Sequence, residues 1–174
     1  MNLHIRSARE SDAAPLCEAE RYWASQGGYL ISQPEELLVD AFSKKIHSLT
    51  HHPNAQYVVL ENEHHQLLGH ALLEPLLLKA LAHTVRLSIV IHYGNEGKGL
   101  GGVLLKHLID WAKGHQNIEK VELLVRATNH RAIQLYESFG FLEEGRHRKR
   151  VKVGNLYLDD IAMGLFVKPS AALR

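Results

Sequence analysis

The feature that most restricts the fold is a glycine-rich loop between a β-branched run and a helical pattern. Five glycines fall within the nine residues from Gly94 to Gly102. The preceding stretch "TVRLSIVIHY" is rich in β-branched residues, which predicts a buried central strand. Behind the glycines, Val103, Leu104 and Leu108 share one face of a helix that ends at Gly114. A strand, a glycine loop and a helix must therefore follow one another here.

The glycine loop has the features of an anion site. Successive glycines let backbone N–H groups converge, and the helix N-terminus adds the positive end of its dipole. The string from Gly97 to Gly102 also matches the dinucleotide fingerprint G-x-G-x-x-G, but the acidic residue that the fingerprint requires is misplaced, since Glu122 lies in the middle of the next strand. A Walker loop is excluded because Gly99 stands where a Ser or Thr is required. A glycine-rich turn without a ligand stays open as the alternative.

The remaining periodicity predicts an α+β fold. The expected strands are residues 3–8, two strands within 56–76, 84–93, 118–127 and a terminal hairpin within 141–167 that turns at Gly154-Asn155. The expected helices are residues 10–28, 33–49, 99–114 and 129–140. This order mixes antiparallel hairpins with one β-α-β crossover. With no linker or repeat, residues 1–174 are expected to form one domain.

Composition narrows the class of protein. Twenty basic and nineteen acidic residues give a net charge of +1, which does not favour nucleic-acid or membrane binding. Cys17 is the only cysteine, so no internal disulfide can form, which suits a reducing compartment. The start "MNLHIRSARESDAAP" has no apolar core of a signal peptide, and the longest apolar run is too short to span a bilayer. We therefore expect a soluble cytoplasmic protein.

The loop and a later segment together resemble a known family. A strand like "LSIVIHY", then a loop of the form Gln/Arg-x-x-Gly-x-Gly/Ala, then an amphipathic helix resembles the acetyl-CoA site of the GNAT superfamily of N-acetyltransferases. The downstream "NHRAIQLYESFGFLEEG" is similar to the second signature of that family, with an Asn, a Tyr and a Gly-Phe at this spacing. The resemblance covers nearly the whole chain and is weakest over residues 22–53. It implies a mostly antiparallel sheet flanked by helices, with one splayed pair of parallel strands.

The resemblance also implies roles for individual residues. Backbone groups of Ile89 and Ile91 are expected to pair with the amides of the pantetheine arm, and Asn129 to offer an amide where the strands open. A plain helix N-cap at Asn129 is an equally open role, and the two roles do not exclude each other. Tyr136 is expected to be catalytic, donating a proton or hydrogen bond to the sulfur that leaves the acetyl group. Packing in the core is the alternative for Tyr136. The pyrophosphate is expected to lie on the loop, at Gly97, Lys98, Gly99, Leu100, Gly101 and Gly102.

Two positions depart from the family pattern. Glu96 stands where the family usually has Gln or Arg, and a carboxylate beside a pyrophosphate would repel it. Either its side chain points to solvent while only backbone groups contact the cofactor, or cofactor affinity is reduced. Many relatives also place a Glu on the strand before the loop, whereas this strand offers Ser88 and His92. Glu20 on the first helix is another candidate for the general base, and we assign none.

Other clusters fit structural roles better. His47 and His51 have the i, i+4 spacing of metal ligands, but the neighbouring Pro53 favours a fraying helix end. The basic run "RHRKR" over residues 146–150 alternates between the two faces of a strand, which favours a solvated strand over a nucleic-acid site. Cys17 fits a small core residue better than a nucleophile, because no histidine is placed to activate it.

The sequence thus predicts an enzyme that moves acetyl from acetyl-CoA to a primary amine, without a metal. Its expected partner is a small amine or amino acid, and a homodimer through edge-strand pairing stays open. Protein N-terminal acetylation is the alternative within the class. A CoA-binding sensor without turnover is the alternative outside it, favoured by the missing strand Glu and by Glu96.

Overall fold

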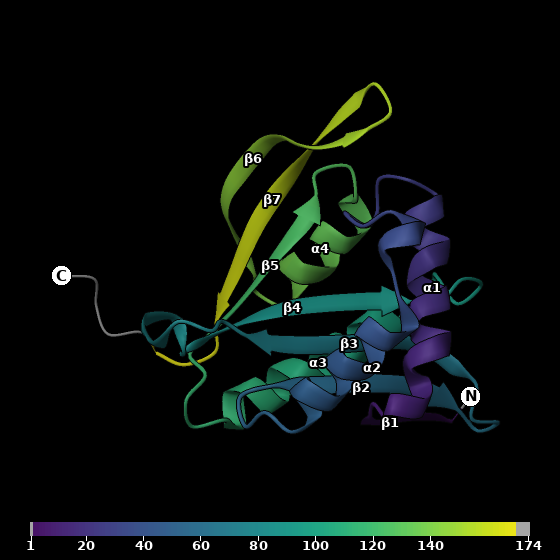
Figure 1. Ribbon diagram of the computed structural model, residues 1–174. Helices are drawn as coiled ribbons and strands as arrows, with labels where there is room; N and C mark the ends of the chain where they lie inside the picture. The colour runs from purple at the N-terminus through teal and green to yellow at the C-terminus, as the bar shows by residue number, and fades with distance from the viewer. Residues whose placement is uncertain (1, 170–174) are drawn as a thin grey trace.

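The computed structural model describes residues 2–169. One seven-stranded sheet has the order β1-β2-β3-β4-β5-β7-β6 (Figure 1). Its strands are β1 (Leu3–Ser7), β2 (Gln56–Asn62), β3 (Leu67–Pro75), β4 (Thr84–Ile91), β5 (Lys120–Arg126), β6 (Leu142–Val153) and β7 (Leu156–Phe166). All neighbouring pairs are antiparallel except β4 and β5. The predicted α+β class and the order of elements are confirmed.

Alternation along the strands divides the core between two faces of the sheet. The helices are α1 (Ala13–Ser25), α2 (Val39–Thr50), α3 (Leu100–Gly114) and α4 (His130–Ser138). Leu104 and Leu108 of α3 pack with one set of alternate strand residues, which includes Val58 and Leu60. The residues between these, such as Val59, belong to the core formed by α1 and α2. Helices α1 and α2 therefore cover the face opposite α3.

The second predicted helix is wrong at its start. Residues Pro34–Glu36 form a short 3₁₀ helix, η2, and α2 begins only at Val39. Leu37 between them is extended and buried. Its carbonyl accepts hydrogen bonds from the Arg21 guanidinium, at 2.9 Å from Nε and 2.6 Å from Nη2. This contact with α1 replaces the helical hydrogen bond that the carbonyl would otherwise accept.

The parallel pair separates as predicted. Strand β4 pairs with β3 along Val85–Ile91, but with β5 only through Thr84, Arg86 and the residue between them. Beyond Arg86 the two strands diverge (Figure 1). The second half of β4 thus has an unpaired backbone edge facing β5.

The terminal hairpin turns at Gly154-Asn155, as predicted, and contains a bulge that was not predicted. Its register shifts between His147 and Val151, and Lys149 adopts a positive φ of 50°. No helix among the described residues has the length and apolarity that a membrane crossing needs.

Candidate functional site

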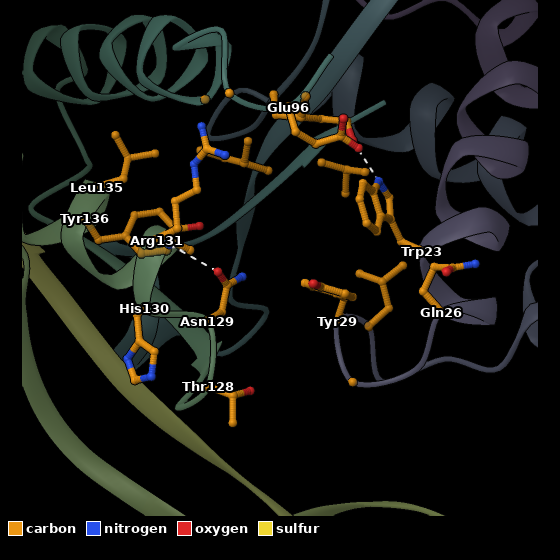
Figure 2. A pocket seen from close by; sticks show the side chains of 18 of the residues that line it. Trp23, Gln26, Tyr29, Glu96, Thr128, Asn129, His130, Arg131, Leu135 and Tyr136 are labelled. Carbon is orange, nitrogen blue, oxygen red and sulfur yellow. Dashed lines mark hydrogen bonds between the residues drawn. The ribbon is translucent and has the colours of Figure 1, made fainter. Parts of the chain in front are cut away.

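A pocket of about 1060 Å³ lies where β4 and β5 separate (Figure 2). One part, the glycine-loop half, is formed by β4, the loop after it, the start of α3 and α4. The other part, the hairpin half, is formed by α1, the loop after it and the β6–β7 hairpin. The hairpin half consists of Trp23, Gln26, Gly27, Gly28, Tyr29, Leu30, Val153, Leu156 and Leu158.

The glycine-loop half contains most of the predicted loop residues. Gly97, Gly99, Leu100, Gly101 and Gly102 all line it. Gly97 and Gly99 have φ values of 83° and 76°, in the left-handed region that strains other residues. Lys98, in contrast, is exposed and does not line the pocket. Its ammonium instead donates to the Gly94 carbonyl at 2.9 Å.

The open edge of β4 directs its free backbone groups into the pocket. The His92 N–H donates to the Leu68 carbonyl of β3 at 2.9 Å. Hydrogen bonding alternates along an antiparallel ladder, so Val90 also bonds toward β3. Ile89 and Ile91 therefore direct their N–H and C=O groups the opposite way, into the gap, and both line the pocket. Pairing with the pantetheine amides would require this backbone orientation.

The Ile91 carbonyl already has a hydrogen-bond partner, Trp23, that could not be inferred from the sequence. The indole Nε1 of Trp23, on α1, donates to the Ile91 carbonyl at 2.7 Å. This hydrogen bond ties α1 to the open edge of β4. The Ile91 N–H and both backbone groups of Ile89 remain directed at the gap.

Helix α4 brings Asn129 and Tyr136 to the pocket. The Asn129 side-chain oxygen accepts from the Ala132 N–H at 3.2 Å, which is the predicted N-cap. Tyr136 is half-buried, and its ring packs against Phe141 with centroids 5.7 Å apart. Burial raises the pKa of Tyr136 to about 12, so its hydroxyl is neutral at physiological pH. A neutral hydroxyl can donate a hydrogen bond into the pocket.

Arg131 is a cation at the glycine loop that sequence reasoning missed. Its guanidinium points toward the loop, and a Cβ built on Gly97 would lie 3.7 Å from Nη2 (Figure 2). First-turn residues of both α3 and α4 line this part of the pocket. Two helix N-termini and one guanidinium therefore converge, and this part of the pocket has the donors and the positive charge that an anion site needs. The sequence signal for this role of Arg131 was a basic residue in the first turn of the helix that Asn129 caps.

Glu96 extends away from these helix N-termini and from Arg131. Its side chain extends from the loop toward Trp23, while Arg131 approaches from the other side (Figure 2). Burial and the neighbouring Tyr93 raise the pKa of Tyr22 on α1, and the negative charge of Glu96 adds to this effect. The carboxylate thus faces α1 and lines the pocket, whereas the first of the two arrangements considered for this position has it pointing to solvent.

The hairpin half is closed by contact between two distant segments. A Cβ on Gly27 would lie 3.3 Å from Val153, and one on Gly28 would lie 3.4 Å from Leu158. The loop after α1 therefore touches the hairpin across the pocket. Both glycines have positive φ, so the backbone reaches this position without strain.

The two candidate bases belong to one hydrogen-bonded chain. His92 Nδ1 lies 3.1 Å from the Leu67 carbonyl and therefore carries a hydrogen, so Nε2 accepts from Nδ1 of His70 at 3.0 Å. His70 Nε2 lies 3.1 Å from Glu20 Oε1, a contact that requires one further proton on either group. Burial, followed by the charge of His70, lowers the pKa of His92 to about 4. Neither His92 nor Glu20 lines the pocket.

The other clusters have structural partners. His47 Nδ1 pairs with Glu10 at 2.9 Å, and His51 Nδ1 with the His47 carbonyl at 2.7 Å. Cys17 is buried, and burial raises the pKa of its thiol. Within residues 2–169, no three His, Cys, Asp or Glu side chains gather where they could hold a metal ion.

The basic run 146–150 wraps around two adjacent carboxylates of β7. Asp159 accepts from Arg146 at 2.8 Å, and fully buried Asp160 pairs with Arg150 at 3.0 Å. Asp160 also pairs with Arg126 of β5. Part of the positive charge is therefore neutralised within the hairpin, and this pairing holds the bulge in place.

Comparisons with known proteins agree with the fold. The model of the acetyltransferase (GNAT) family matches residues 19–141. Spermidine N(1)-acetyltransferase of Vibrio cholerae serotype O1 is 28% identical over 139 residues, covering 79% of this chain and 74% of that protein.

Two solved structures have the same fold at low identity. A putative acetyltransferase from Salmonella typhimurium with its cofactor acetyl-CoA aligns with a TM-score of 0.89 at 22% identity, covering 100% of this chain and 99% of the other. A phosphinothricin acetyltransferase from Sinorhizobium meliloti in complex with acetyl-CoA has a TM-score of 0.87 at 20% identity, covering 95% of this chain and 89% of the other.

Proposed function

The chain is an acyltransferase of the acetyltransferase (GNAT) family, and we propose that it moves the acetyl group of acetyl-CoA directly to a primary amine. The observation that carries this proposal is the open edge of β4 beside two converging helix N-termini. We take residues 1–174 as one N-acetyltransferase domain, with a reducing compartment such as the cytoplasm as its expected location.

The residues present fit acetyl-CoA. The N–H groups of Gly97 to Gly101 and the Arg131 guanidinium would hold the pyrophosphate, because both present donors to one point. The Gly102 N–H, also predicted to bind it, already donates to the Gly99 carbonyl at 3.0 Å. Ile89 and the Ile91 N–H would pair with the pantetheine amides. Asn129 would bind at the mouth of the gap. Glu96, directed toward α1, would leave the pyrophosphate contacts to backbone groups and to Arg131.

The chemistry needs one donor and one acceptor of protons. Acetyl-CoA supplies an activated acetyl thioester. As the amine nitrogen forms its bond to the acetyl carbon, the bond from that carbon to sulfur breaks. Tyr136 would donate to the departing sulfur, since it lines the pocket and its hydroxyl is neutral. The amine must also lose a proton, and we assign this step to no residue.

The test is thiol release from acetyl-CoA with a panel of primary amines. Turnover with at least one amine, together with a loss of turnover in Tyr136→Phe, supports the proposal. Calorimetric binding of acetyl-CoA without turnover on any amine, including N-terminal peptides, would favour a CoA-binding sensor. Acetylation of peptide N-termini alone would favour a protein N-terminal acetyltransferase.

A further inference from the structure

The hairpin half of the pocket is apolar. Its side chains are aliphatic or aromatic apart from the amide of Gln26. Leu156 and Tyr29 keep 69% and 53% of their surface exposed, although both are large and line the pocket. Exposed apolar side chains that line a pocket are typical of a site that buries an apolar ligand.

No free carboxylate faces this part of the pocket. Among residues 2–169, Glu96 is the only Asp or Glu that lines the pocket at all, and it belongs to the glycine loop. Of the carboxylates on the elements that form the hairpin half, Glu18 and Glu143 do not line the pocket, and Glu144 pairs with Lys120. Glu20 contacts His70, Asp159 pairs with Arg146, and Asp160 pairs with Arg126 and Arg150.

The hairpin beside the pocket also carries a surplus of cations. Arg148, Lys149 and Lys152 of β6 are exposed. The ammonium groups of both lysines lie 5.5 Å from the ring centroid of Tyr157. A ligand with several positive charges would meet these cations, and the hairpin half would offer its additional charges no carboxylate to replace their lost hydration.

We propose that the amine acceptor is a monoamine with an apolar body, aromatic or aliphatic, and not a polyamine. This inference rests on the proposed function, because it names the substrate class of the same site. One side of the apolar body contacts Trp23 of α1 and Tyr29 of the loop after it. Its other side contacts Leu156 and Leu158 of the hairpin. The single ammonium points toward Glu96 and the gap between the strands, where the acetyl group is transferred.

The experiment compares 2-phenylethylamine with spermidine, which is of similar size. Thiol release from acetyl-CoA reports kcat/KM for each amine, and calorimetry on the CoA-bound protein reports binding without requiring turnover. We expect kcat/KM for 2-phenylethylamine to exceed that for spermidine at least about tenfold, because its ring replaces water on apolar side chains. Equal values, or a preference for spermidine, would overturn the inference.

The binding measurement separates this inference from the proposed function. If neither amine is acetylated but 2-phenylethylamine binds at least about tenfold more tightly, the substrate-class inference stands for the site and the transfer activity fails. If neither amine binds, the inference is wrong.

A pair of variants tests the location. Leu156→Glu places a carboxylate in the hairpin half at a position exposed enough to tolerate it. It should shift the ratio of the two kcat/KM values toward spermidine by about tenfold, since one ammonium then gains a partner. Leu142→Glu is the matched control, because Leu142 is 73% exposed on β6 and does not line the pocket. An equal shift in both variants would refute a role for the hairpin half.

Discussion

Replacing His92 with glutamine distinguishes a catalytic from a structural histidine. His92 uses both ring nitrogens, one donating to the Leu67 carbonyl and the other accepting from His70. A glutamine amide offers one donor group and one acceptor, so it can keep both kinds of contact while removing the titrating ring. Because His92 has no free lone pair and does not line the pocket, we expect kcat of His92→Gln to stay within about threefold of wild type.

The same substitution should change stability in acid. Burial, followed by the charge of His70, lowers the pKa of His92 from 6.5 to about 4, against the opposing hydrogen bond to Leu67. The folded state therefore resists protonation that the unfolded chain accepts. The stabilisation is present above pH 6.5 and is lost as the pH falls toward 4. For a shift of this size, up to about 2.5 kcal/mol of unfolding free energy is lost between about pH 7.5 and 4.5.

Urea unfolding at several pH values measures this loss directly. Wild type and His92→Gln share all their acidic groups, so the difference between their pH profiles isolates the histidine. His107→Gln, on an exposed face of α3, is the control and should keep the wild-type profile. Identical profiles for wild type and His92→Gln would refute the burial argument. A loss of kcat of about a hundredfold in a folded His92→Gln protein would instead identify His92 as the base.

Four further substitutions test the pocket and its frame. Tyr136→Phe should lower kcat at least about tenfold while the melting temperature stays near that of wild type, because the ring contact with Phe141 is kept; an unchanged kcat would remove Tyr136 from the mechanism. Glu96→Gln should leave acetyl-CoA affinity unchanged or tighten it in a calorimetric titration, and clear weakening would contradict the orientation of its side chain. Arg131→Gln should weaken acetyl-CoA binding about tenfold, less at high salt, and an unchanged Kd would place the pyrophosphate elsewhere. Asp160→Asn should cost about 3 kcal/mol in urea unfolding, since it leaves Arg126 buried without its counter-charge; wild-type stability would refute this.

The glycine loop could be predicted from the sequence because its determinants are local. Left-handed backbone at Gly97 and Gly99, a β-branched strand before them and a helix after them all lie within one stretch of chain. The opening beside Ile89 was inferred from the family resemblance, because the residues of β4 do not indicate where its pairing with β5 ends.

Contacts between distant segments could not be predicted in the same way. Trp23 and Ile91 are separated by 68 residues, and Glu20 and His70 by 50. The break before α2 has the same origin, because the Leu37 carbonyl bonds to Arg21 of another helix. Periodicity reports which face of an element is apolar, but not which side chain of another element will reach it.

Because β4 and β5 pair over three residues only, the sheet consists of two parts that are weakly joined. Strands β1 to β4 form one ladder and β5, β7 and β6 another, and backbone hydrogen bonds join the two ladders only near Thr84. A ligand bonded to Ile89 and reaching α4 would bridge them. Filling the pocket should therefore slow amide hydrogen exchange at Ile89 and stiffen the two ladders against one another. The bound co-substrate would then also join the two ladders of the sheet, and its release at the end of each catalytic cycle would separate them again.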